Sequence, residues 1–379
     1  MNHNQPDKAG GQMKIRRRNL IIALALVIAV PFLSSLPATA ENTQFDIIGR
    51  WSTDNETLRP ITLVEDRLYL AGESTIEAWD TQNGRRLWKQ PLEKGADFRP
   101  RLAGDLILAN SKSYMIAFDR ETGQKRWSYQ PNAPLGTPYY HNGRVFLGVG
   151  HLLSALDVTT GKVQWTMSSD QAKGIWYAPT VYANSVLAGL GDGYLYSLDI
   201  ETGKLNWKVN RAKKWQYLRQ LFTSGDTLVA GGYKDNLFGI DAATGKHKWY
   251  WYSGNFINSH LVYDGVAYLW SPTGWVYSLN ARSGKRNWRT KSDYFPRKSG
   301  KKTPWAPVMA EIVADTKGIY VLDMKSVVHV LDHINGKEIA AIQFKERLRP
   351  FVVLEPGTRR MFLGNTKGEI LYVENKYIP

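Results

Sequence analysis

Residues 155–165 read ALDVTTGKVQW, a stretch in which an aspartate, a glycine and a tryptophan stand four positions apart. Six more copies of this pattern occur along the chain, and we call all seven the turn motif. They are AWDTQNGRRLW at 78–88, AFDRETGQKRW at 117–127, SLDIETGKLNW at 197–207, GIDAATGKHKW at 239–249, SLNARSGKRNW at 278–288 and VLDHINGKEIA at 330–340. The copies start at intervals of 38 to 52 residues, which indicates a repeat architecture.

Short apolar runs rich in β-branched residues, leucine and tyrosine separate the motifs. Turn pairs such as Asn142-Gly143 and Asp264-Gly265 divide these runs, so we expect strands joined by hairpins. Residues 45–379 show no sustained helical periodicity. Four strands in about forty residues are typical of one propeller blade, and the repeats should therefore form a ring.

Each residue type in the turn motif has a structural role. The aspartate ends the third strand of a blade, where its carboxylate can accept hydrogen bonds from the following turn. The glycine supplies a positive φ, and the tryptophan buries on the order of 200 Å² between neighbouring blades. These roles are assigned to Asp80, Gly84, Trp88, Asp119, Gly123, Trp127, Asp157, Gly161, Trp165, Asp199, Gly203, Trp207, Asp241, Gly245, Trp249, Gly284 and Trp288.

The two ends of the repeat region determine the number of blades. Residues 347–374 supply three strands without a turn motif, whereas FDIIGRW at 45–51 supplies one outer strand that carries Trp51. We therefore predict an all-β, eight-bladed β-propeller of four-stranded antiparallel blades, with the last blade closed by the N-terminal strand. This closure removes an exposed sheet edge. The single propeller domain is predicted to span residues 41–379.

Residues 1–40 have the layout of a secretory signal peptide, with basic residues at 14–18, an apolar run at 20–33 and small residues that end at Ala40. A transmembrane anchor is the alternative, but about 14 apolar residues are fewer than the roughly 20 of a helical span. The Arg17-Arg18 pair leaves both general secretion and twin-arginine export open. Cleavage after Ala40 would release a soluble periplasmic protein.

Composition restricts the function further. The chain has no cysteine, which excludes disulfides, thiolate metal sites, covalent haem attachment and a lipid-modified cysteine. Its formal charge is +15, of which about +11 lies on the mature part. We expect acidic partner surfaces, such as anionic lipid headgroups, acidic proteins or envelope polymers, and no nucleic acid for an exported protein.

The pattern A-L-D-x-x-T-G-x-x-x-W resembles the repeat of the pyrroloquinoline-quinone-like propeller superfamily, over residues 45–379. That superfamily includes quinoprotein dehydrogenases and non-catalytic binding propellers. Among the latter, the chain resembles the family of outer-membrane β-barrel assembly factors B. The resemblance implies a scaffold that binds envelope proteins, with the outer-membrane protein assembly machinery as partner. The missing lipid anchor and the positive charge leave a different client open.

The alternative is a quinone-dependent oxidoreductase that binds pyrroloquinoline quinone and Ca²⁺. Such dehydrogenases are known for adjacent cysteines above the quinone, which this chain lacks, and for a tryptophan beneath it. Trp176, Trp215 and Trp305 stand at blade starts, where they could stack on a ligand or simply pack. The histidines show no short metal-ligand spacing, and no nucleophile elbow or phosphate loop occurs. We predict no catalytic, metal-binding or cofactor-binding residues.

A second repeat marks the start of the innermost strand in each blade, and we call the segment before it the lead-in loop. The marker residues are Pro60, Pro100, Pro138, Pro179, Gln220, His260, Pro307 and Pro350. Arginines precede four of them, namely Arg59, Arg99, Arg219 and Arg349. Guanidinium groups around a channel mouth suit carboxylates, so an anion- or acidic-peptide-binding face is predicted here.

Other interpretations of this face stay open. Each arginine could instead pair with a local acid, for which Glu56, Asp97 and Glu346 are available. The loops RAKKWQYLR at 211–219 and SDYFPRKSGKKTPWAP at 292–307 mix basic and aromatic residues, as binding loops and solvated loops both do. Exposed tryptophan and tyrosine at this face would also suit envelope polysaccharide.

Overall fold

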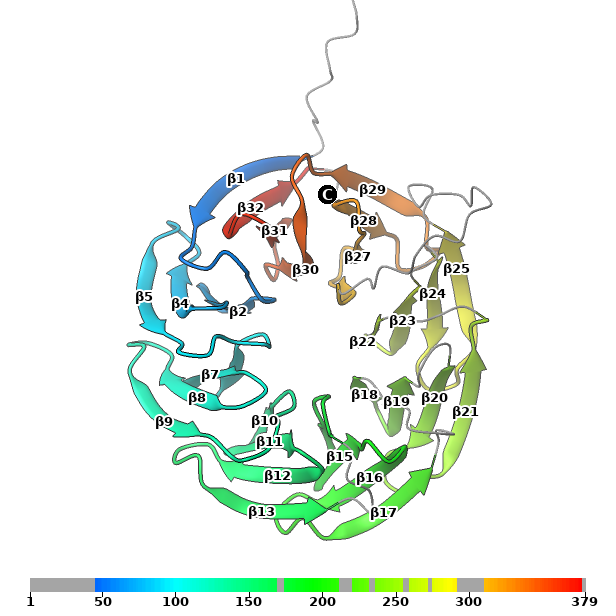
Figure 1. The fold of residues 1–379 in the computed structure, drawn as a ribbon. Coiled ribbons are helices and arrows are strands. Elements are labelled where there is room, and N and C mark those ends of the chain that lie inside the picture. The colour runs from blue at the N-terminus through cyan, green and yellow to red at the C-terminus, as the bar shows by residue number, and fades with distance from the viewer. Residues whose placement is uncertain are drawn as a thin grey trace, which may run out of the picture. The chain divides into compact units, whose positions relative to one another are not determined.

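The computed structural model describes residues 45–168, 174–210, 220–231, 236–254, 259–271, 275–291 and 310–376. These residues belong to one compact unit, Asn42–Pro379. Their 32 strands form eight four-stranded antiparallel sheets arranged in a ring (Figure 1). The predicted eight-bladed β-propeller is confirmed. Within the described residues, the structure contains no helix of the length and apolarity that a membrane span requires.

The first four blades follow one another along the chain, each with its strands in sequence order from the channel outward. Blade 1 comprises β2 (Thr62–Val64), β3 (Arg67–Ala71), β4 (Thr75–Asp80) and β5 (Arg86–Pro91). Blade 2 comprises β6 (Arg101–Ala103), β7 (Leu106–Asn110), β8 (Met115–Asp119) and β9 (Lys125–Tyr129). Blade 3 comprises β10 (Tyr139–His141), β11 (Arg144–Val149), β12 (Leu152–Asp157) and β13 (Val163–Ser168). Blade 4 comprises β14 (Thr180–Tyr182), β15 (Ser185–Gly189), β16 (Tyr194–Asp199) and β17 (Leu205–Asn210).

Blades 5 to 7 repeat this order, and blade 8 departs from it. Blade 5 comprises β18 (Leu221–Ser224), β19 (Thr227–Gly231), β20 (Asn236–Asp241) and β21 (His247–Tyr252). Blade 6 comprises β22 (Ser259–Tyr263), β23 (Val266–Trp270), β24 (Trp275–Asn280) and β25 (Arg286–Lys291). Blade 7 comprises β26 (Val313–Ala314), β27 (Ile319–Leu322), β28 (Val327–Leu331) and β29 (Glu338–Gln343). Blade 8 comprises β30 (Leu348–Leu354), β31 (Arg360–Asn365), β32 (Glu369–Asn375) and β1 (Phe45–Ser52).

The N-terminal strand closes the ring, as the sequence predicts. Strand β1 pairs antiparallel with β32, with Phe45 opposite Asn375 and Trp51 opposite Ile370. Figure 1 shows the two strands side by side, in blue and red. Because β1 comes from the other end of the chain, its pairing joins the first and last repeats and protects the edge of β32.

The apolar core lies between the blades. Middle strands such as β7 are buried along their whole length, whereas outer strands such as β13 alternate between buried and exposed residues. Between blades 1 and 2, Tyr69 and Ile76 pack with Ile107 and Phe118. Clusters of this kind fill the seams, and one of them extends over both seams of blade 7, from Tyr268 of blade 6 to Val352 of blade 8.

The sequence alignment of blade 7 was wrong. Strands β2 and β6 begin one or two residues after their markers Pro60 and Pro100, but β26 begins at Val313, six residues after Pro307. Pro307 itself lies outside the described residues. The insertion before blade 7 made proline an unreliable marker there, and the position near the channel is instead filled by Glu311, two residues before β26.

Candidate partner-binding face and channel

The aspartate of the turn motif organises the turn that follows it. In blade 3, Asp157 Oδ1 accepts hydrogen bonds from the backbone N–H groups of Thr159 at 3.0 Å and Thr160 at 2.9 Å. The Thr159 and Thr160 hydroxyls also donate to this oxygen, at 2.6 and 2.8 Å. These hydroxyl bonds, the Thr159 bond first, lower the pKa of Asp157 because they favour its charged form. Backbone bonds of the same kind are made to Asp80, Asp119, Asp199, Asp241, Asn280 and Asp332.

The tryptophan of one blade lies on the motif glycine of the next blade. In blade 4, a Cβ on Gly203 would lie 2.6 Å from Cε3 of Trp165, which belongs to blade 3. The Trp165 Nε1–H donates to the backbone oxygen of Ile200 at 3.2 Å, beside the same turn. The same placement joins Trp51 to Gly84, Trp88 to Gly123, Trp127 to Gly161, Trp207 to Gly245, Trp249 to Gly284 and Trp288 to Gly336.

One seam lacks this contact. Blade 7 has Ala340 at the position of the tryptophan, and blade 8 has no turn motif because β1 reaches it from the other end of the chain. Phe344 and Phe45 pack there instead, with ring centroids 4.7 Å apart. The place where the chain closes the ring therefore uses a different apolar contact from the other seven seams.

The two faces of the ring carry different segments. Neighbouring strands in each blade are antiparallel, so the lead-in loops and the turns between second and third strands share one face. The turn motifs lie on the opposite face, together with the hairpins between first and second strands. We call the first of these the lead-in face. It carries the three predicted arginines that the structure describes, Arg59, Arg99 and Arg349.

Three of the four predicted arginines are described, and two of them contact the adjacent lead-in loop. The guanidinium of Arg59 donates from Nε to the Ala96 carbonyl at 2.7 Å and lies 3.8 Å from the Asp97 carboxylate. Arg349 Nη2 donates to the backbone oxygen of Glu56 at 3.0 Å. Arg349 and Arg59 therefore each connect one blade to the lead-in loop of the next. Arg219, Trp215 and Trp305 lie outside the described residues, and Trp176 is half-buried in the lead-in loop of blade 4.

The local acids play a different part from the one expected. Of the three acids named from the sequence, Asp97 lies 3.8 Å from Arg59, and Glu56 contacts Arg349 through its backbone oxygen. Glu346 instead binds Arg50 of β1, with Nη2 2.8 Å from Oε1. Arg99 pairs across the channel with Glu311 of the blade 7 lead-in loop, 3.1 Å from Nη2 to Oε2. Glu311 was missed because its position could not be aligned across the insertion.

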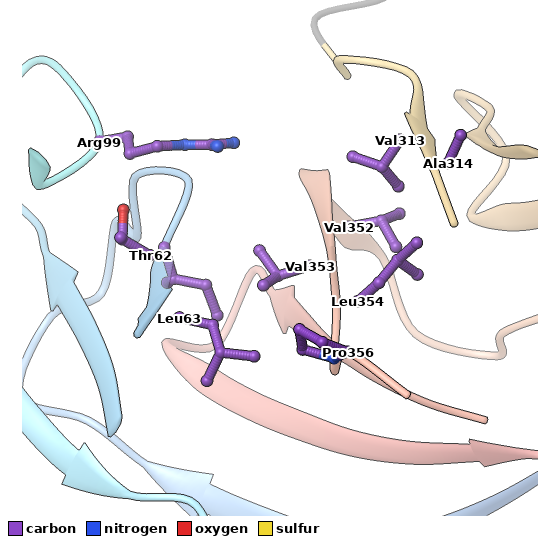
Figure 2. A pocket seen from close by; sticks show the side chains of 10 residues that line it. Thr62, Leu63, Arg99, Val313, Ala314, Val352, Val353, Leu354 and Pro356 are labelled. Atoms are coloured by element: carbon purple, nitrogen blue, oxygen red, sulfur yellow. The ribbon is translucent and has the colours of Figure 1, made fainter. Parts of the chain in front are cut away.

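A cavity of about 290 Å³ opens at the inner strands of blades 1, 7 and 8. Its walls are mostly aliphatic, with Leu63 from blade 1, Val313 from blade 7 and Val352 from blade 8. Figure 2 shows Arg99 extending over this space from the lead-in loop of blade 2. The arrangement combines a guanidinium group with an apolar surface. Such a combination can bind an anion that has an apolar part.

Arg101, on β6, stands two residues after Arg99 and was not singled out from the sequence. Its Nε is buried and makes no hydrogen bond in the described part of the chain. Burial and then the positive charge of Arg99 together lower the pKa of Arg101 to about 10, and the charge of Glu311 opposes this shift. The alternation of side chains along β6 could not have pointed to it, because Arg99 stands before the strand.

The two histidines of blade 7 form hydrogen bonds with neighbouring groups of the fold. His329 is 1% exposed, and its Nδ1 lies 2.8 Å from the Glu338 carboxylate. His333 contacts the Tyr268 hydroxyl at 2.9 Å and the Asp315 carbonyl at 2.6 Å. Among the residues that the structure describes, no group of three or more histidine or acidic side chains is placed to hold a metal ion.

Comparisons with known proteins agree with this architecture. A family model described as the outer membrane protein assembly factor BamB matches residues 49–174, 135–249 and 191–349. A curated relative, the BamB of Legionella pneumophila (strain Paris), is 26% identical over 148 residues. That match spans 35% of this chain and only 38% of the length of the relative.

Solved structures share the fold at low identity. The crystal structure of BamB from Moraxella catarrhalis superposes with a TM-score of 0.68 and 18% identity, over 88% of this chain and 98% of that one. A europium-containing methanol dehydrogenase superposes with a TM-score of 0.65 and 12% identity, over 84% of each chain. At these identities both likenesses show the fold alone.

Proposed function

The chain belongs to the family of the outer membrane protein assembly factor BamB, and from this premise we propose that it is an exported, non-catalytic scaffold in outer-membrane protein assembly. It would act in the periplasm and bind protein partners through the lead-in face. The observation that carries the proposal is the family match, which recurs in three overlapping segments from residue 49 to residue 349. The match therefore covers the repeats themselves rather than one local motif.

The geometry supports a binding role for the lead-in face. Eight blades closed by β1 make a rigid platform, and loops on a rigid platform are where binding residues concentrate. Arg59, Arg99 and Arg349 lie in this face and leave part of each guanidinium group free for a carboxylate, since each has few contacts. With the net positive charge of the chain, they favour an acidic partner surface.

In-cell photo-crosslinking followed by identification of the captured proteins tests this function. A crosslinking residue replaces exposed Glu56 in the lead-in loop of blade 1, and a matched control replaces exposed Gln82 in the turn motif of the opposite face. We expect proteins of the outer-membrane assembly machinery at position 56 and not at position 82. Equal capture at both positions, or none at either, would contradict the proposal.

A triple variant tests the arginines. Arg59, Arg99 and Arg349 are changed to alanine together, and the crosslinked yield at position 56 is compared with that of the parent chain. The expected result is a clear loss of the captured partner, with the thermal midpoint measured alongside to detect any damage to the ring. Unchanged capture by the folded variant would remove these arginines from the binding face.

We further propose that this role requires neither pyrroloquinoline quinone nor Ca²⁺. The sequence supports this view because it has no cysteine pair of the kind found in the quinone dehydrogenases. An absorbance titration of the purified protein with quinone and Ca²⁺, followed by a dye-linked alcohol oxidation assay, provides the test. Saturable quinone binding together with turnover would establish the enzyme alternative.

A further inference from the structure

Blade 6 has an excess of positive charge. Its described residues, 259–271 and 275–291, contain five lysines and arginines but one acid, Asp264, which lies in the hairpin between the two innermost strands. Part of the excess comes from Asn280, which stands where the other six turn motifs have an aspartate. All five cations are exposed, namely Arg282, Lys285, Arg286, Arg289 and Lys291.

None of these five side chains forms an ion pair in the part of the chain that the structure describes. The acids Asp226 and Asp241 of the neighbouring blade 5 both lie within ion-pair distance of Lys248 instead. Arginines on the outer strands of other blades do have acidic partners. These pairs are Arg50 with Glu346, Arg86 with Asp54 and Arg126 with Asp119. The positive charge of blade 6 is therefore available to a partner.

Three of the cations lie on β25, the outermost strand of the blade, at the circumference of the ring (Figure 1). Two of them lie over the ring of Trp275 on the adjacent strand. The guanidinium carbon of Arg289 is 5.0 Å from the ring centroid, and Nζ of Lys291 is 5.7 Å from it. Such cation–π contacts hold the charged groups in place without neutralising them.

The outer strand of blade 5 adds aromatic side chains beside this charge. On β21, Tyr250 is 52% exposed and Tyr252 is 59% exposed, and Trp251 between them is half-buried. Trp251 packs against Tyr277 of blade 6 with ring centroids 5.1 Å apart, so the two blades are in contact here. We call the combined surface the basic rim. It comprises Tyr250, Trp251, Tyr252, Trp275, Arg286, Arg289 and Lys291.

The side chains of the basic rim favour one kind of partner. Each lysine or arginine close to an anionic lipid surface strengthens binding by roughly fivefold. Tyrosine and tryptophan combine an apolar ring with a polar group, and they concentrate at the boundary between headgroups and hydrocarbon. A soluble polyanion would bind the cations and leave the tyrosines in water, whereas a bilayer surface accommodates both.

We propose that the basic rim attaches the protein to a bilayer that contains anionic phospholipids. The cations contact the headgroup phosphates, and Tyr250 and Tyr252 lie at the level of the headgroups. Because the basic rim is at the circumference of the ring, this contact leaves the lead-in face open to protein partners. The attachment goes beyond the scaffold role and does not depend on it.

Co-sedimentation of the purified protein with vesicles tests the attachment. One set of vesicles is phosphatidylcholine alone, and the other is an equal mixture of phosphatidylcholine and phosphatidylglycerol. At low salt we expect affinity for the anionic vesicles to be higher by roughly tenfold or more. High salt should reduce this difference because it screens exposed charges.

Two results would overturn the proposal. One is equal binding to both kinds of vesicle, and the other is the absence of binding to either. Saturable binding of polyglutamate without vesicle binding would assign the basic rim to an acidic protein instead. None of these measurements uses partner capture in cells, so failure of the attachment and failure of the scaffold role are separate outcomes.

Two triple variants locate the surface. The first changes Arg286, Arg289 and Lys291 to glutamine and should lower affinity for anionic vesicles by roughly tenfold or more. The control changes Arg85, Lys125 and Lys162 to glutamine, which removes the same charge from exposed positions on blades 1 to 3 and should leave affinity nearly unchanged. An equal loss in both variants would mean that net charge alone drives binding, and it would contradict the proposal.

A tyrosine variant keeps the test open if the first triple variant does not fold. Tyr250→Ser together with Tyr252→Ser leaves every charge in place and should weaken binding to anionic vesicles, because the aromatic rings no longer reach the headgroup boundary. Thermal midpoints of all variants show whether the ring is intact. Unchanged binding by the folded tyrosine variant would count against a bilayer as the partner.

Discussion

The indole ring of Trp88 covers Gly123 of the next blade so closely that a Cβ on this glycine would lie 2.6 Å from Cδ2 of the ring. Gly123 therefore has two constraints, a positive φ of 71° and a neighbouring blade that leaves no room for a side chain. The Trp88 Nε1–H donates to the Arg120 carbonyl at 3.0 Å, in the same turn. The turn motif thus works between blades as well as within one, and its parts can be tested separately.

Substitution of the motif glycine should cost more than the positive φ alone explains. Gly203 and Gly143 both have positive φ, but a Cβ on Gly143 would meet nothing within 4 Å. We expect Gly143→Ala to cost about 1–2 kcal/mol for the backbone conformation. Gly203→Ala should cost about 1–3 kcal/mol more, because Trp165 must move. Chemical unfolding of the two variants gives the difference; equal midpoints would show that the ring adapts freely.

The hydrogen bond from the indole N–H should contribute different amounts to the free energy of unfolding in different blades. Trp127 Nε1 donates to the Val158 carbonyl at 2.7 Å, whereas Trp207 Nε1 is buried without a hydrogen-bond partner among the described residues. Phenylalanine keeps most of the apolar contact and removes the N–H group. Trp127→Phe should therefore lower stability by about 1 kcal/mol more than Trp207→Phe. Thermal unfolding of both proteins measures this difference, and the reverse order would be inconsistent with the geometry.

Ring closure should weaken in acid. Arg50 of β1 binds Glu346 at 2.8 Å and Glu369 at 2.6 Å. The Arg50 bond lowers the pKa of Glu346, and bonds from Asn365 and then Arg50 lower the pKa of Glu369. A lowered folded-state pKa gives stability that is present above the unfolded value of about 4.3 and is lost as pH falls through the folded value.

The matching variant isolates this effect. Arg50→Gln should reduce stability at pH 7 by about 1 kcal/mol or less, because the Arg50 side chain is 41% exposed. It should also make the midpoint less dependent on pH below about 4.3. Thermal melts of both proteins over the acid range provide the measurement. The same pH dependence in both would assign acid sensitivity to other carboxylates.

His329 should give the opposite pH dependence. Burial disfavours its charged form, but the Asp323 carboxylate, 3.4 Å from Nε2, and the Glu338 carboxylate, 2.8 Å from Nδ1, outweigh burial and raise the pKa of His329. A raised pKa gives stability that is full below the unfolded value of about 6.5 and is lost as pH rises through the folded value. The His329→Gln variant should lack this loss on the alkaline side. Melts of both proteins at increasing pH above 6.5 test it, and parallel curves would exclude His329 as the cause.

The fold was predictable because its signals are local. Asp157 and the turn that it organises lie within a few residues of one another, and this short unit recurs often enough to give the number of blades. Closure by β1 was also predictable, since residues 347–374 lack an outer strand and residues 45–51 supply one. The distance from the marker to its strand departs most in blade 7, where β26 begins six residues after Pro307.

Only the tertiary structure could decide which residues meet across the ring. Arg99 of blade 2 and Glu311 of blade 7 are 212 positions apart. No sequence pattern connects such pairs, because the contact depends on how eight blades are placed around one axis. For the same reason the sequence explained Gly123 by its own φ, while its contact with Trp88 became visible only in the folded ring. Hydrogen bonds within a turn join residues that are close in the sequence, so the sequence predicts them. Contacts between blades and across the channel depend on how the blades pack, and only the folded structure shows them.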